Sequence, residues 1–363
     1  MDDRYLIQDT REVKDFSTKT FSGYKKSEVI NSVLKSIEGK KIENACFWAT
    51  ECIVSGYTVS LWNKLLIFAF KIIHINNPRL PSYLLRKHTI FYNQLRAIDY
   101  KKQNNILLVR NSQMIRNLFF DIITVLATSL KTKRYDKPVK IEDSDFNWIV
   151  IQSKIQSSMN ILPDNILLFH DPDEFQIIIN EIYTMCKNKE FGYDKCRFWT
   201  AWLMKWISLH KKKKKPLNIS TRDISNIDPK YCSDISWLLW SVIFEEVKQR
   251  KEKQITDQIN SLYLLYKHDY TSGKQTSRIS YIYNAYGLLT HGIDFSLPIH
   301  QEYDITIQVQ TNVNKMFFMK KEFQSMKENK REQKKIKKSN VEKEKIFNKL
   351  DIFNEFDSLI MKS

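Results

Sequence analysis

Glycine is scarce in this chain. Only 7 of its 363 residues are glycine, about 2% where about 7% is usual for globular proteins. Tight turns between β-strands depend on glycine because it adopts left-handed backbone conformations without strain. The shortage therefore argues against an all-β protein, and the helical spacing of the apolar residues predicts an all-α fold.

Disulfide frameworks and long apolar runs are lacking as well. The five cysteines include no Cys-x-x-Cys pair and mostly lie in apolar helical stretches, which predicts small buried side chains in a reducing compartment. The N-terminus lacks the basic-then-apolar pattern of a signal peptide. The most apolar segment, residues 61–75, is interrupted by polar side chains and is predicted to be a core helix, without a membrane partner.

The sequence also lacks the motifs of the common enzyme classes. It has no glycine-rich phosphate-binding loop, no His-Glu-x-x-His zinc motif and no nucleophile elbow. The spacing of Cys46 and Cys52 suits neither a zinc site nor a redox dithiol. We therefore expect a protein that is not an enzyme and that binds no cofactor and no metal.

Positive charge is abundant. The chain has 58 Lys and Arg against 41 Asp and Glu, a net charge of +17. Such an excess favours a polyanionic partner, either nucleic acid or an acidic protein surface. An AT-rich genome, which enriches Lys, Asn and Ile together, would produce the same excess without any binding role.

One amphipathic segment occurs twice in related form. The first copy, Cys46-Phe47-Trp48, lies in a helical pattern, and Cys196-Arg197-Phe198-Trp199 repeats its Phe-Trp pair 151 residues later. This repetition predicts a multi-helical bundle of two related helical halves, residues 27–188 and 189–300, preceded by a polar arm at residues 1–26. The tryptophans that follow Trp199 at helical spacing are expected to lie in the core rather than to stack on bases.

The segment between these copies is less regular. Residues 141–168 have weak periodicity, which predicts short extended pieces around residues 148–151. Asp171-Pro172-Asp173-Glu174 follows, and we interpret its acidic residues as caps and first-turn charges of the next helix rather than as metal ligands.

Two lysine-rich stretches are the candidate phosphate contacts. Each follows a predicted helix, so each could also be a solvated helix end that interacts favourably with the helix dipole. The second contains the densest positive charge in the chain. The candidate nucleic-acid-binding residues are Lys131, Lys133 and Arg134 in the first stretch and Lys211, Lys212, Lys213, Lys214 and Lys215 in the second.

The C-terminal part of the chain is predicted to be an extension of the bundle. Residues 301–345 read as a charged helix and flexible tether, and residues 346–363 as an amphipathic segment. An apolar stripe on a charged tether is typical of a docking peptide for a viral or host protein, although it could also fold back onto the bundle. The candidate docking residues are Phe347, Leu350, Phe353 and Phe356.

Several of these motifs together carry a resemblance. Residues 41–48, the His74-Ile75-Asn76-Asn77-Pro78 stretch, residues 196–199 and Asp234-Ile235-Ser236-Trp237 resemble an uncharacterised protein that recurs in large nucleocytoplasmic DNA viruses of algae and protists. The likeness covers roughly residues 40–295. It implies a viral origin, with the host cytoplasm, a virus factory or the virion as location, and it supplies no activity or catalytic residue.

The combined expectation is a helical viral protein that binds nucleic acid, or proteins bound to nucleic acid, during genome replication, transcription or packaging. The alternative is a structural or adapter protein that works through protein–protein contacts. The distribution of positive charge distinguishes the two, because a continuous positive face favours nucleic acid and scattered lysines favour an adapter.

Overall fold

A computed structural model describes residues 3–132, 137, 139–214 and 217–322. These residues form an all-α protein, which confirms the predicted fold class, and their only β-type pairing is an isolated bridge between Lys19 and Lys25. The chain separates into two compact units. Unit 1 contains residues 1–61, 94–127 and 303–363, and unit 2 contains residues 62–93 and 128–302.

This division differs from the two consecutive halves predicted from the repeated Phe-Trp motif. The chain leaves unit 1 within α3 (Thr58–Phe68) and returns to it near the end of α4 (Leu80–Ala97). It leaves again at the end of α5 (Gln113–Thr128) and returns at α12 (Tyr303–Thr311). Each unit is therefore assembled from segments that are distant in the sequence.

Unit 1 is built around a hairpin of α1 (Lys26–Glu38) and α2 (Ile42–Val54). α1 buries Val29, Val33 and Ile37 at helical spacing, as its sequence pattern predicts. The left-handed residue between the helices is Lys40, with φ 57°, and not the glycine before it. The N-terminal arm is packed into this unit, with Phe16 and Phe21 buried.

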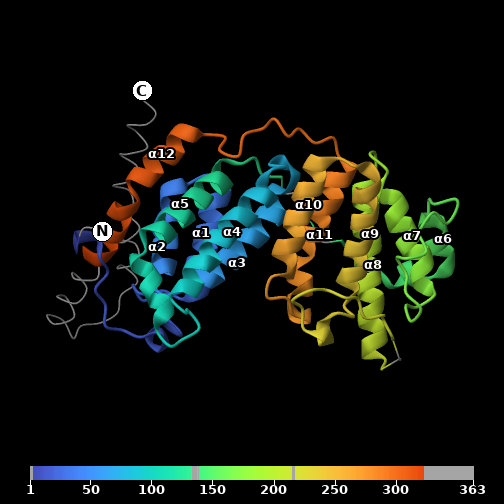
Figure 1. The fold of residues 1–363 in the computed structure, drawn as a ribbon, viewed down its shortest axis with the longest axis horizontal. Coiled ribbons are helices and arrows are strands. Elements are labelled where there is room, and N and C mark those ends of the chain that lie inside the picture. The colour runs from blue at the N-terminus through green and yellow to red at the C-terminus, as the bar shows by residue number, and fades with distance from the viewer. Residues whose placement is uncertain (1–2, 133–136, 138, 215–216, 323–363) are drawn as a thin grey trace. The chain divides into compact units, whose positions relative to one another are not determined.

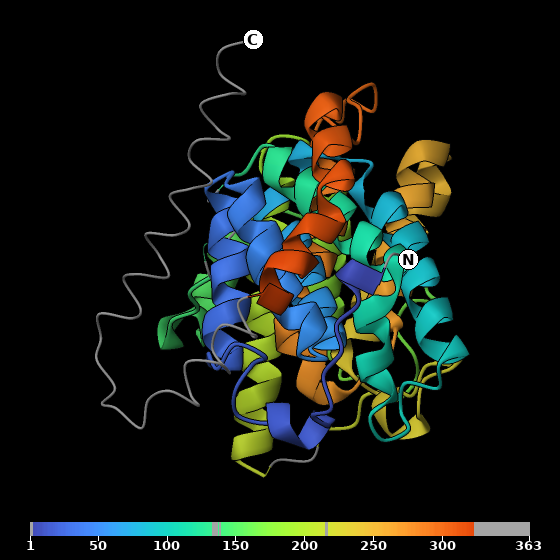
Figure 2. The same ribbon diagram turned by 90° about the vertical axis from the view of Figure 1, so that its left-hand side faces the viewer.

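The segment that follows α12 also belongs to the core of unit 1. A helix continues to Glu322 and buries Val313, Phe317 and Lys320, and Figure 2 shows it running across the other helices of this unit. The polar helix predicted from about residue 303 is thus confirmed over the described residues, but it is packed into unit 1 through the apolar face of Val313, Met316 and Phe317.

Unit 2 contains six helices of its own besides parts of α3 and α4. They are α6 (Trp148–Lys154), α7 (Glu174–Cys186), α8 (Gly192–Lys212), α9 (Ile235–Arg250), α10 (Lys253–Lys267) and α11 (Gln275–Thr290). α11 packs against α7, α8, α9 and α10, and the last three run beside it (Figure 1). It buries apolar side chains on all sides, including Tyr281, Tyr286 and Leu289.

The α7–α8 hairpin locally resembles the α1–α2 hairpin. In both, the second helix carries a half-buried phenylalanine followed by a buried tryptophan. The Phe47 and Trp48 rings meet edge to face with centroids 5.3 Å apart, and those of Phe198 and Trp199 meet likewise at 5.1 Å. The other neighbours of the two tryptophans differ, since Trp48 meets Tyr24 and lies near the Lys320 ammonium, whereas Trp199 meets Trp202. The duplication itself stays a prediction.

Two sequence-based expectations for unit 2 are wrong. The stretch around Trp148 forms the helix α6, capped by the Asn147 side chain, which accepts a hydrogen bond from the amide of Ile149. Asp171 does not cap α7. Its carboxylate is buried and lies 2.6 Å from the guanidinium of Arg222, a partner 51 residues away that sequence spacing could not indicate.

A close helix–helix approach in unit 2 requires glycine at position 192. A Cβ atom there would lie 2.2 Å from the carbonyl oxygen of Met185. We expect Gly192→Ala to lower the free energy of unfolding by about 3 kcal/mol, since the backbone must shift to relieve the overlap. Gly273→Ala is the control, because its Cβ would have no atom closer than 4.0 Å. Equal melting temperatures for the two variants would contradict this packing.

Candidate nucleic-acid interface

α8 changes character along its length. Its first four turns are core, with Cys196, Trp199 and Leu203 fully buried and Trp202 nearly so. The last turns leave the core: Trp206 is half-buried, and the lysines that follow are exposed. The core position predicted for the tryptophan stripe is therefore confirmed for Trp199 and Trp202 but only in part for Trp206.

An aromatic pocket of about 190 Å³ lies beside the outer part of α8. This volume is below the ~300 Å³ of pockets for drug-sized ligands, so it has room for one flat ring rather than a large molecule. Trp148 is its most accessible aromatic wall, with 52% of its surface exposed. The lining residues are Phe146, Trp148, Ile151, Glu174, Ile177, Ile178, Trp202 and Trp206.

Two walls of this pocket, Trp202 and Trp206, are held in place by contacts with neighbouring groups. The indole N–H of Trp202 donates to the carbonyl oxygen of Asp145 at 2.8 Å. Trp206 stacks roughly parallel to Trp202, at 6.4 Å between centroids, and meets Phe175 edge to face at 5.7 Å. Rings that are already ordered lose little conformational entropy when another ring binds against them.

His210 connects the pocket to the lysine run. Its ring lies over Trp206 with centroids 3.7 Å apart, one helical turn further along α8. Lys211, Lys212, Lys213 and Lys214 follow directly, and all four are exposed.

None of these four ammonium groups forms an ion pair with an acid in the described part of the chain. Their attraction to the C-terminal end of the helix dipole is worth only about 0.3–1 kcal/mol each at an exposed site. They consequently present positive charge that no described acidic group neutralises.

The other predicted basic residues are placed differently. Lys131 is half-buried, and its ammonium group donates to the carbonyl oxygen of Ser129 at 2.8 Å. The same loop meets the start of α8, where Arg197 donates to the carbonyl oxygen of Lys137. Lys211 is 14 residues further along α8, about 21 Å at the helical rise. Among the described residues, no contact joins Lys131 to the lysines at the end of α8. Lys133, Arg134 and Lys215 lie outside the described residues, as do the docking residues Phe347, Leu350, Phe353 and Phe356.

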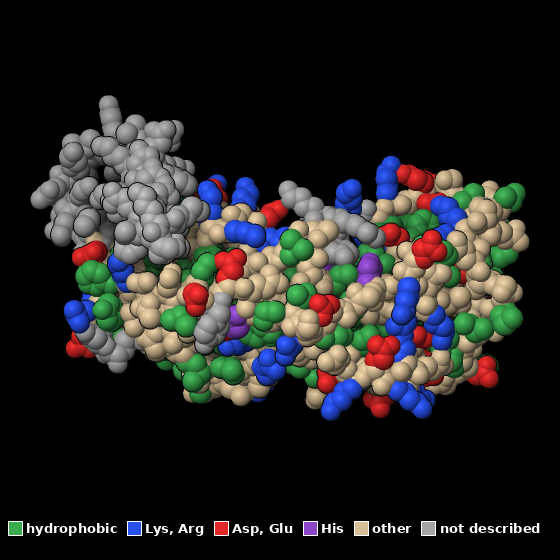
Figure 3. Space-filling view, turned by 90° about the horizontal axis from the view of Figure 1, so that it is seen from above, with side chains coloured by type: hydrophobic (Ala, Val, Ile, Leu, Met, Phe, Trp, Pro, Cys, Tyr) green, Lys and Arg blue, Asp and Glu red, His purple; other side chains and the backbone are tan. Residues whose placement is uncertain are grey.

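Charge is mixed on one face of the molecule. On the face shown in Figure 3, Lys and Arg occur in small groups interspersed with Asp and Glu, so this face carries no continuous positive area. Because this face offers no continuous positive area, a nucleic-acid role depends on the lysine run of α8 and the adjoining pocket.

His74 and the five cysteines, which are residue types common in catalytic and metal sites, are buried in this protein. His74 is fully buried beside Tyr193, and burial lowers the pKa of its imidazole to about 3, so it stays neutral. All five cysteines are free and buried, as predicted. In the parts of the chain that are described, no three His, Cys, Asp or Glu side chains gather as metal ligands.

One helical segment, Thr58–Asn76, is long and apolar enough to cross a membrane, but 61% of it is buried within the protein. A core role accounts for that burial, although the segment is longer than the sequence-based estimate of residues 61–75 suggested.

Sequence analysis did not identify Phe146 and Trp148 as pocket walls, because their region was expected to be extended. The residue that could have indicated a helix there is Asn147, because asparagine is a favourable N-cap.

The chain matches no protein-family model, no curated protein and no solved structure.

Proposed function

We propose that this protein binds single-stranded nucleic acid, without catalysing a reaction on it, through the end of α8 and the aromatic pocket beside it. The main observation behind this proposal is that an aromatic pocket adjoins four exposed lysines on one helix. None of these lysines forms an ion pair among the described residues. Stacking of unpaired bases on aromatic rings beside a positive track is the usual means of single-strand binding.

The spacing along α8 supports this combination. His210 lies one turn, about 6 Å, beyond Trp206, and Lys213 lies two turns, about 10 Å, beyond it. A base that enters the pocket against Trp206 therefore places the neighbouring phosphates within reach of the flexible lysine side chains. Paired bases in a duplex could not enter a pocket for one ring, so we expect a preference for single strands.

The biological setting that we propose rests on the resemblance of the sequence to a protein of large DNA viruses. We infer a role in viral genome replication, transcription or packaging, in the host cytoplasm or the virion. Each of these processes exposes single-stranded nucleic acid.

A gel-shift titration across a salt series tests the proposal. With single-stranded oligonucleotides, the logarithm of the association constant should fall linearly with the logarithm of the salt concentration, because bound phosphates release counterions. A duplex of the same length should bind more weakly. No shift at about 50 mM salt, where phosphate contacts are strong, would refute the proposal.

Substitution of Trp148 tests the stacking part of the interface. Loss of one stacked base is worth about 1–3 kcal/mol, so Trp148→Ala should weaken single-strand binding roughly 5- to 150-fold. Ile149→Ala is the matched control, because Ile149 is the next residue on α6 and is 74% exposed. If the two variants bind equally well, the pocket does not hold a base.

An adapter role is the second candidate, and a specific observation favours it. Large apolar side chains are exposed between α6 and α7, above all Phe169 at 96% and Met159 at 67%. Exposed apolar groups of this kind often mark protein–protein contacts. If the protein is an adapter, Phe169→Asp should abolish capture of a viral or host protein partner, and the wild-type protein should not bind nucleic acid.

Residues 346–363 are a further proposed docking segment, and their deletion provides the second arm of this test.

A further inference from the structure

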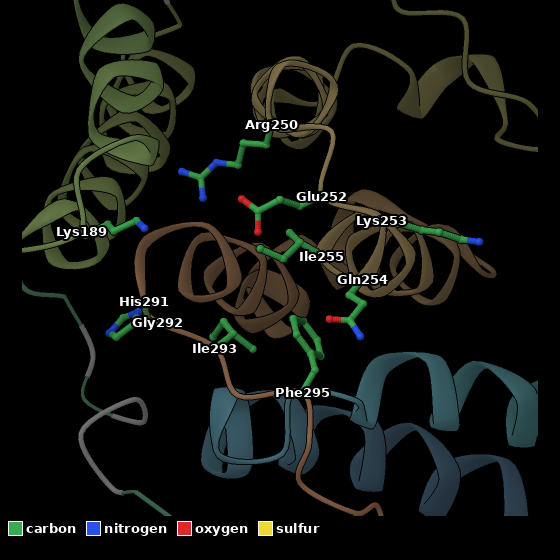
Figure 4. A pocket seen from close by; sticks show the side chains of 10 residues that line it. All are labelled: Lys189, Arg250, Glu252, Lys253, Gln254, Ile255, His291, Gly292, Ile293 and Phe295. Carbon is green, nitrogen blue, oxygen red and sulfur yellow. The ribbon is translucent and has the colours of Figure 1, made fainter.

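A second cavity in unit 2, of about 400 Å³, lies where α9 passes into α10. Its other walls are the turn before α8 and the segment that follows α11 (Figure 4). The volume falls within the ~300–1,000 Å³ range of small-molecule sites. This cavity involves none of the residues at the end of α8, so an inference about it does not depend on the proposed interface.

Two cationic groups lie on one side of this cavity. The Arg250 guanidinium is held by Glu246, 2.6 Å from its Nε, and by the carbonyl oxygen of Cys186, 2.8 Å from its Nη2. Its remaining nitrogen, Nη1, has no hydrogen-bond partner among the described residues. Lys189 is exposed and has no ion-pair partner among the described residues, and Figure 4 shows it extending toward Arg250.

The guanidinium is therefore oriented in advance with one donor edge open, and an ammonium group lies nearby. This arrangement suits a phosphate, whose oxygens accept charge-assisted hydrogen bonds from both groups. The first turn of α10, residues 253–255, also lines the cavity, and its amides carry the partial positive charge of a helix N-terminus.

The rest of the cavity has a different chemistry. Glu252 lies between Arg250 and Ile255 in Figure 4, and its exposed carboxylate points to the side of Arg250 without a hydrogen-bond or ion-pair partner among the described residues. Ile255, Ile293 and Phe295 supply apolar walls away from the cations. A carboxylate in this position is satisfied by a hydroxyl or amino donor, and the apolar walls by a flat ring.

We propose that this cavity binds a small phosphate-bearing molecule with hydroxyl groups and a flat ring, which is the chemistry of a nucleoside monophosphate. The phosphate is held by Arg250 and Lys189, a hydroxyl or amino group donates to Glu252, and the ring lies against Ile293 and Phe295. The ligand thereby supplies a hydrogen-bond partner for each of the three charged groups, Arg250, Lys189 and Glu252.

Isothermal titration calorimetry of the full chain with adenosine 5′-monophosphate, adenosine and inorganic phosphate tests this site. The monophosphate should bind at least tenfold more tightly than either fragment, because only it reaches both ends of the cavity. No saturable binding of the monophosphate up to about 1 mM, or equal binding of phosphate alone, would overturn the proposal.

Two variants locate the binding. Lys189→Gln should weaken monophosphate binding about tenfold through loss of one charge-assisted hydrogen bond. Lys253→Gln removes the same charge from another lining residue but should have little effect, since its ammonium group points away from Arg250 and Lys189 in Figure 4. If both variants weaken monophosphate binding equally, the ligand responds only to the overall positive charge of this region. That result would overturn the proposed phosphate contact with Lys189.

Gly292→Phe introduces a ring at the wall of the cavity. Gly292 is exposed, and no atom lies within 4 Å of a Cβ added there, so the first side-chain atom is accommodated without a clash. The substitution should abolish monophosphate binding while the melting temperature stays unchanged. If this variant fails to fold, the Lys189→Gln and Lys253→Gln pair decides. Replacement of the α8 lysines should leave this binding intact, which separates it from the nucleic-acid interface.

Discussion

Replacement of Lys320 with methionine should lower the free energy of unfolding by about 3–5 kcal/mol, the usual cost of leaving one buried charge without its partner. Lys320 and Glu51 are both buried in unit 1, and the ammonium nitrogen lies 2.8 Å from a carboxylate oxygen. Ser22 also donates to Glu51, from its amide at 2.6 Å and its hydroxyl at 2.7 Å. The Lys320 ammonium further lies 3.6 Å from the centre of the Phe47 ring.

Thermal unfolding followed by circular dichroism measures this effect. Lys41→Met, at an exposed position, is the control for the change in side-chain type. The double variant Glu51→Leu/Lys320→Met should recover most of the loss, since replacing both charges by apolar groups is often nearly neutral. If Lys320→Met is as stable as the wild type, the Lys320–Glu51 ion pair does not stabilise the helix that contains Lys320.

The same ion pair should make unit 1 sensitive to acid. Burial acts to raise the pKa of Glu51, but the Lys320 charge and the hydrogen bonds outweigh it and hold that pKa below its ordinary value. Because the folded-state pKa is depressed, the stabilisation is complete above the unfolded-state pKa of about 4.3 and is lost as pH falls through the folded-state value. The advantage of the wild type over Glu51→Gln should therefore shrink below about pH 4.

Neutralising the lysine run has the largest expected effect on binding. Replacement of Lys211, Lys212, Lys213 and Lys214 by glutamine should weaken single-strand binding roughly 100-fold or more at low salt. It should also reduce the slope of log affinity against log salt by about 2.8, or about 0.7 for each phosphate that a lysine no longer neutralises. Fluorescence anisotropy with a labelled oligonucleotide measures both quantities. Stability should change little, because all four side chains are exposed.

A control with the same change of net charge separates a local site from general attraction. Lys35, Lys40, Lys41 and Lys101 are exposed residues of unit 1, and their replacement by glutamine also removes four charges. This variant should bind single strands almost as well as the wild type. If both quadruple variants lose affinity equally, the lysines of α8 form no specific interface.

The sequence predicted what depends on local pattern. Scarce glycine and helical spacing indicated the all-α class, and they placed Trp199 and Trp202 in a core. The features it missed depend on contacts between distant segments. Glu51 and Lys320 are 269 residues apart, and Lys320 lies in a lysine-rich stretch where nothing distinguishes a buried lysine from a solvated one. The pocket wall at Trp148 was missed because α6 is only 7 residues long, too short for a clear helical period.

Photo-crosslinking tests the central claim most directly, because it locates the nucleic acid on the protein. A single-stranded oligonucleotide containing 5-bromouracil would be irradiated with the full chain, and the crosslinked peptides identified by mass spectrometry. The proposed interface predicts crosslinks at Trp148, Trp206 or His210, and their loss when Lys211 to Lys214 are replaced by glutamine. Crosslinks confined to other regions, or none under conditions where binding is saturated, would contradict it.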